Sequence, residues 1–110
     1  MPASVPNDRL AGLVAALGRD DTRELVALYL DSCPGLIADI AGSDALCAER
    51  AAHSMKSSSQ QMGLPGLAKK LAALEGRLRS TGQAATPAEV ETLKAEYALA
   101  EGPLRAFAKD

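Results

Sequence analysis

Aromatic residues are scarce in this chain, which has no tryptophan, one phenylalanine and two tyrosines. Strands favour β-branched and aromatic side chains, whereas the apolar residues here are mostly alanine and leucine, which favour helices. No segment alternates apolar and polar residues over the length of a strand. The composition therefore argues against a β-sheet protein and predicts an all-α fold.

Long runs of one charge are also missing, because lysine and arginine never occur more than twice in a row. The formal net charge is −2, so no basic surface is predicted that would attract nucleic acid or an anionic membrane. No apolar run approaches the ~20 residues of a membrane span, and MPASVPNDRL lacks the segments of a signal peptide. We expect a cytoplasmic protein with no nucleic-acid or membrane partner.

Residues that bind metals or act as nucleophiles are equally few, with two cysteines and one histidine. Cys33 and Cys47 fit no metal-ligand spacing, and we expect each to be a small buried hydrophobe. His53 has no second histidine, reactive cysteine or carboxylate pair with which to form a hydrolytic or metal site. No cofactor or metal is therefore expected to bind this chain.

Helix-start and helix-stop residues divide the chain into five predicted helices. Asn7 is a typical N-cap, and Thr86 and Glu89 form a capping box with proline at the first helical position. Glycines stand where several of the helices should end. The predicted helices span about 8–17, 20–41, 44–62, 65–80 and 87–109.

Prolines stand inside two of these predicted helices. Proline has no N–H group for the helical hydrogen bond, and its ring crowds the preceding turn. We therefore expect a kink at Pro34–Gly35 and an interruption or bend at Gly102–Pro103.

Each long helix carries apolar residues at alternating intervals of three and four, the spacing of one buried face, which we call the seam of the helix. With short connections, four such helices predict an antiparallel up-and-down four-helix bundle. Residues 1–110 would then form a single domain, with the short first helix covering one end. The predicted seams are Leu25, Leu28, Ser32, Leu36 and Ile40; Ala45, Ala48, Ala52, Met55, Ser59 and Met62; Leu64, Leu67, Leu71, Leu74 and Leu78; and Val90, Leu93, Tyr97, Ala100, Leu104 and Phe107.

His53 lies one step off the seam of its helix, about 100° around from Ala52. It is therefore expected to be at least partly exposed. By itself it could be an ordinary solvated side chain. Neutral imidazole is nucleophilic and can receive a phosphoryl group. The negative charge of that group needs a cation nearby, which Arg50 and Lys56, one turn before and one turn after His53, could supply. The mostly polar residues that share its stripe are Leu46, Glu49, Arg50, Lys56, Ser57 and Gln60.

The segment AAHSMKSSSQQMG, residues 51–63, resembles the signature of the histidine-containing phosphotransfer (HPt) family. That signature is approximately H-x-x-K-G-S-S, with a glycine ten residues after the histidine. The flanking segments RELVALYLDSCPGLIADI and LAKKLAALEGRL look like the helices around the motif in that family, so the resemblance covers about residues 20–80. We expect a stand-alone domain of the bacterial type. The matching positions are His53, Lys56, Ser58, Ser59 and Gly63.

The resemblance implies a phosphoryl carrier of a multistep phosphorelay, without an ATP site and therefore not an enzyme in the ordinary sense. His53 would accept a phosphoryl group through Nε2 from the aspartate of one response-regulator receiver domain and pass it to another. Lys56 would offset the phosphoryl charge, and the receiver would contribute the Mg²⁺. The implied partners are receiver domains and a hybrid histidine kinase, and the family suggests a monomer.

Ser57 departs from the family pattern, which has glycine after the lysine so that the receiver can approach closely. We expect slower or more selective transfer from this difference. The predicted docking surface follows the histidine stripe and centres on Leu46, because an exposed apolar residue on a polar face indicates partner contact. Arg50 and Gln60 flank it, although Leu46 could instead pack beneath the first helix.

Three other functions stay open on the sequence. An HPt-like adaptor would bind receiver or kinase domains without phosphotransfer, and Ser57 is the main reason to consider it. A plain four-helix interaction module would carry the H-x-x-K pattern by accident. The domain could also belong to a larger kinase, as in chemotaxis kinases, where a separate domain phosphorylates the histidine from ATP.

Overall fold

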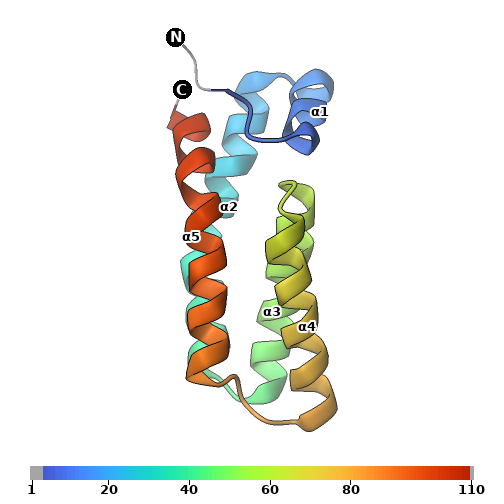
Figure 1. Ribbon diagram of the computed structural model, residues 1–110. Coiled ribbons are helices and arrows are strands. Elements are labelled where there is room, and N and C mark those ends of the chain that lie inside the picture. The colour runs from blue at the N-terminus through green and yellow to red at the C-terminus, as the bar shows by residue number, and fades with distance from the viewer. Residues whose placement is uncertain (1–3, 110) are drawn as a thin grey trace.

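The computed structural model describes residues 4–109, in which all regular structure is helical (Figure 1). This confirms the predicted all-α class for that part of the chain. α2 and α3 differ from their predicted ranges by one residue at each end, and α4 ends one residue later. The helices are α1 (Asp8–Leu17), α2 (Arg19–Gly42), α3 (Ala45–Gln61), α4 (Pro65–Thr81) and α5 (Pro87–Lys109).

The four long helices lie side by side as a helical bundle, and the molecule including α1 extends 47 Å along its longest axis. α3 packs between α2 and α4, and α2 also packs against α5. α1 packs on α2 at the end of the bundle where α5 finishes (Figure 1). Short connections bring successive helices such as α2 and α3, or α3 and α4, together in space, whereas the α2–α5 contact joins helices that are distant in the sequence.

Asn7 ties α1 to the end of α3. Its side-chain oxygen accepts a hydrogen bond from the Leu10 amide at 2.9 Å, and its amide nitrogen donates to the Met62 carbonyl at 2.9 Å. Gly63 has a φ of +74°, and a Cβ there would lie 2.3 Å from the Asn7 side-chain oxygen. Glycine is therefore needed at this position both for its backbone conformation and for the close approach of Asn7.

The seams predicted for the last three helices form most of the core, whereas the seam predicted for α2 is correct at Ile40 but wrong in its first half. Leu25 and Leu28 are 38% and 65% exposed. α2 carries two parallel apolar stripes, and the one that faces the bundle is displaced by one residue from the prediction. Packing against α3 and α5 decides between the two, which spacing alone cannot do. The buried residues of α2 are Thr22, Val26, Tyr29, Leu30, Cys33, Ile37 and Ile40.

One buried hydrogen bond joins α2 to α3. The hydroxyl groups of Tyr29 and Ser59 lie 2.8 Å apart in the core. This contact explains a serine at a seam position, because a buried hydroxyl is tolerated when it has a partner.

The two cysteines differ in environment. Cys33 is fully buried in the α2 seam, as expected. Cys47 is exposed, so its predicted burial is wrong. It lies in the first turn of α3, one position before the fully buried Ala48, and faces away from the core.

Of the interruption or bend predicted at Gly102–Pro103, the interruption is absent, because α5 continues through both residues. Both residues are exposed, while Leu104 and Phe107 are fully buried and hold the final turns on the bundle. α2 likewise runs through Pro34 as one helix. Packing of the flanking residues outweighs the loss of one helical hydrogen bond at each proline.

α2 is also long and apolar enough, by length and composition alone, to cross a membrane, with a mean hydropathy of 1.4 over its most apolar window. A core helix of a soluble bundle passes the same test. Part of this apolar surface, including Val26 and Ile40, lies in the core, whereas Leu25 and Leu28 are exposed.

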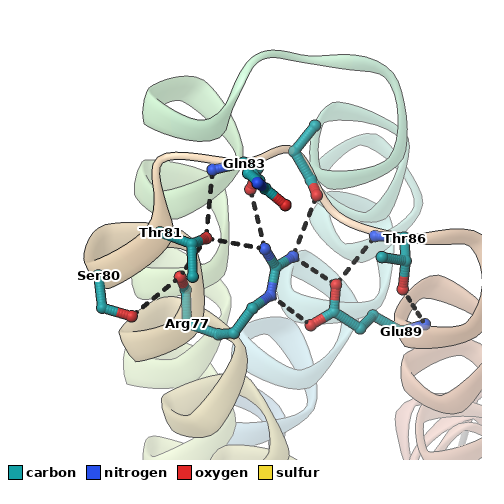
Figure 2. A network of polar contacts seen from close by, with 7 residues as sticks. Arg77, Ser80, Thr81, Gln83, Thr86 and Glu89 are labelled. Carbon is teal, nitrogen blue, oxygen red and sulfur yellow. Dashed lines mark hydrogen bonds and ion pairs between the residues drawn. The ribbon is translucent and has the colours of Figure 1, made fainter.

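Arg77 fastens the connection between α4 and α5 (Figure 2). Its guanidinium group forms an ion pair with Glu89, which also completes the predicted capping box with Thr86. The remaining Arg77 donors hold the turn itself. They bond to the Thr81 hydroxyl and to the carbonyls of Gln83 and Ala84, each at 3.1 Å.

Candidate functional site

His53 projects from α3 beside α4, with its side chain 60% exposed. Its neighbours in the sequence hold the helix in place, because Ala52 and Met55 are fully buried. The Nδ1 atom lies 2.8 Å from Oε2 of Glu75 on α4. The imidazole is therefore anchored on one side and open to solvent on the other.

Glu75 joins three basic side chains, including that of His53, and its own side chain is only 6% exposed. Its Oε1 accepts a hydrogen bond from Lys56 Nζ at 2.6 Å, and its Oε2 also accepts one from Arg79 Nη2 at 3.2 Å. The Lys56 hydrogen bond, aided by the one from His53, lowers the pKa of Glu75. Glu75 is thus ionised at neutral pH and compensates the cations around it.

The charge on Glu75 determines which imidazole nitrogen is free. An ionised carboxylate can only accept hydrogen bonds, so Nδ1 of His53 must be the donor. In the neutral imidazole the second nitrogen, Nε2, then carries a lone pair and no proton. No hydrogen-bond partner for Nε2 is found among residues 4–109. In that neutral form, the exposed imidazole offers Nε2 as its nucleophilic nitrogen.

A shallow hollow of about 390 Å³ lies beside His53 on the surface formed by α3 and α4. Leu46 is 56% exposed at its edge, so Leu46 does not pack beneath α1, which lies at the other end of α3. The hollow combines two arginines and two carboxylates with one apolar contact. Its lining residues are Leu46, Glu49, Arg50, His53, Ser54, Glu75 and Arg79.

Comparison with known proteins agrees with this arrangement. A family model described as the Hpt domain matches residues 24–102, from the first turns of α2 to the last part of α5. The chain belongs to the Hpt domain family. Hpt domains are histidine phosphotransfer modules of phosphorelay signalling, which interact with receiver and kinase domains. No curated protein and no solved structure matches the chain.

The structure brings only part of the predicted Hpt site together. His53 and Lys56 meet on Glu75, and Leu46 and Arg50 share the hollow. Ser57, which is partly buried, and the exposed Gln60 do not line it. Lys56 itself is only 21% exposed and directs its ammonium group at Glu75.

Sequence reasoning missed the α4 side of this Hpt site. Glu75 follows the seam residue Leu71 by four positions and precedes Leu78 by three, so a carboxylate was placed beside a buried stripe. An acidic residue in that position needs a partner, and this was a usable signal. Its partners on α3 could not be read from spacing, because they depend on how α3 and α4 pack.

Within residues 4–109 of this Hpt domain, no group of three histidine, cysteine, aspartate or glutamate side chains is placed to hold a metal ion. The chemical resources of the site are the imidazole, one buried carboxylate and the surrounding cations.

Proposed function

We propose that this protein is a phosphoryl carrier that accepts a phosphoryl group on Nε2 of His53 from a receiver-domain aspartate and transfers it to another receiver. The hydrogen bond from His53 Nδ1 to the buried Glu75 carries this proposal, because in the neutral imidazole it leaves the Nε2 lone pair free on a side chain that is 60% exposed. General nucleophilic chemistry requires such a free lone pair.

In the accepting step, the Nε2 lone pair of His53 attacks the phosphorus of the aspartyl phosphate. The N–P bond forms while the bond between phosphorus and the aspartate oxygen breaks, and the aspartate leaves as a carboxylate. Mg²⁺ belongs to the receiver in this scheme, and the carrier needs no cofactor or ATP site of its own. Nδ1 of His53 keeps its proton throughout, and Glu75, which accepts that hydrogen bond, balances the positive charge on the imidazole ring.

Lys56 acts in this proposal as the cation that offsets phosphoryl charge. It also keeps Glu75 ionised, since its ammonium group lies 2.6 Å from Oε1. Leu46, Arg50, Ser57 and Gln60 form the proposed contact surface for the partner, with Leu46 as its apolar anchor. Ser57, in place of the family glycine, limits how closely a receiver approaches and tunes the transfer rate.

We further infer that the four long helices run antiparallel in up-and-down order, which their short connections support. The protein would act as a cytoplasmic monomer between a hybrid histidine kinase and a response regulator. The second candidate is an adaptor that binds receiver or kinase domains without transfer, and the departure at Ser57 supports that alternative.

The test is a transfer assay with a panel of receiver domains phosphorylated on aspartate in the presence of Mg²⁺. Label should pass to the wild-type protein and not to His53→Gln, and Lys56→Ala should accept it more slowly. If receivers bind but no label passes, and Ser57→Gly restores transfer, the protein is an adaptor. Absence of both binding and transfer across the panel would contradict both candidates.

A further inference from the structure

Arg79 lies beside the His53 site and is bonded to two carboxylates, although its side chain is 65% exposed. Its Nε donates to Glu49 Oε1 at 2.7 Å, and its Nη2 donates to Glu75 Oε2 at 3.2 Å. The two carboxylates come from different helices, α3 and α4. A long exposed arginine ordinarily samples many rotamers, and two charged contacts of this kind restrict it.

The contact with Glu75 places the guanidinium group next to the imidazole. Arg79 Nη2 and His53 Nδ1 both bond to the same oxygen atom, Oε2. Arg79 also lines the hollow that His53 opens onto. One edge of the guanidinium fork is therefore occupied, while Nη1 has no hydrogen-bond partner among the described residues.

Lys56 and Arg79 differ in what they can offer a phosphoryl group. Lys56 is mostly buried and directed at Glu75. Arg79 is exposed to the hollow and retains two free N–H donors on Nη1, and a guanidinium fork suits phosphate oxygens better than a point charge does.

We propose that Arg79, positioned by Glu49 and Glu75, binds the phosphoryl group on His53 through Nη1 and thereby sets the lifetime of the phosphohistidine. This inference rests on the proposed function and assigns a second cation to the same site. A cation bound to the phosphoryl oxygens hinders the approach of water to the phosphorus atom and slows cleavage of the N–P bond. Glu49 is a positioning residue that keeps the guanidinium plane aligned.

The experiment loads the protein chemically with potassium phosphoramidate, which transfers its phosphoryl group to imidazole with ammonia as the leaving group. The excess donor is removed and the loss of phosphohistidine is followed by ³¹P NMR. Arg79→Gln should shorten the lifetime by roughly tenfold, the low end of what one charge-assisted hydrogen bond contributes. Glu49→Ala should shorten it by a smaller factor, and Arg79→Lys should fall between wild type and Arg79→Gln.

Arg105→Gln is the matched control, because Arg105 is an exposed arginine paired with Glu101 on α5, away from the hollow. It should have the wild-type lifetime. Equal lifetimes for wild type and Arg79→Gln, or an equal shortening by Arg105→Gln, would overturn the inference. If wild type and His53→Gln take up phosphoryl groups equally, the proposed function itself fails, which separates the two failures. Thermal unfolding of each variant checks that the fold is retained.

Discussion

Replacement of Glu75 by glutamine is the most informative perturbation of this site. The substitution retains size and shape but removes the charge on which His53 Nδ1 and Lys56 Nζ converge at 2.8 and 2.6 Å. A hydrogen bond to a charged group contributes about 1.5–3 kcal/mol. Part of that loss is recovered, because the neutral amide costs less to bury and Lys56 can move toward solvent. We expect Glu75→Gln to lower the free energy of unfolding by about 1–2 kcal/mol.

The chemical effect should exceed the effect on stability. Glutamine can accept a hydrogen bond from Nδ1–H of His53 or donate one to an unprotonated Nδ1, so it no longer selects one tautomer. If the lost preference is about 1.4 kcal/mol, phosphorylation at Nε2 slows roughly tenfold. Glu75→Asp is the matched variant that retains the charge but shortens the reach.

The assay uses the fact that the chain has one histidine. Uniform ¹⁵N labelling gives one pair of imidazole nitrogen signals, so the tautomer of His53 is read without assignment by mutation. Phosphorylation by phosphoramidate is timed on the same samples. A wild-type protein with its proton on Nε2, or a Glu75→Gln variant phosphorylated at the wild-type rate, would refute the reasoning.

Three further predictions concern stability. Lys56 is the main cause of the lowered pKa of Glu75, so the stability that ionised Glu75 contributes is present above its ordinary pKa of 4.5 and lost as pH falls below it. Urea titrations at several pH values should therefore show a weaker pH dependence of the unfolding free energy for Glu75→Gln than for wild type. Leu71 is fully buried and Leu99 is 76% exposed. Denaturant unfolding should show that Leu71→Ala lowers the free energy of unfolding by about 2–5 kcal/mol, and Leu99→Ala by under about 0.5 kcal/mol. Equal losses would contradict the assigned core. Gly63→Ala forces a Cβ against Asn7 at a φ of +74° and should cost more than about 1 kcal/mol in thermal unfolding; a wild-type melting temperature would exclude the close approach.

Local signals predicted much of this fold because they are strong where packing is simple. Asn7 and the Thr86–Glu89 capping box start α1 and α5 as expected. The leucines of α4 recur on one face only, so its seam could be recognised from spacing. α2 has apolar residues on two adjacent stripes, and only contacts with the neighbouring helices determine which stripe is buried.

The sequence placed part of the α3 side of the site together, but none of the α4 side. His53, Lys56 and Arg50 belong to one helix, where a periodicity of 3.6 residues relates them directly. Glu75 and Arg79 are 22 and 26 positions further along, and their distance from His53 depends on the register between two helices. That register results from core packing, which no pattern within a single helix specifies.

The most direct test of the central claim is to identify the nitrogen of His53 that carries the phosphoryl group. The ¹⁵N-labelled protein, phosphorylated by a receiver or by phosphoramidate, would be examined for ³¹P–¹⁵N coupling in the imidazole ring. The account predicts coupling to Nε2, with Nδ1 still protonated and hydrogen-bonded to Glu75. Phosphorus on Nδ1, or on any residue other than His53, would contradict it.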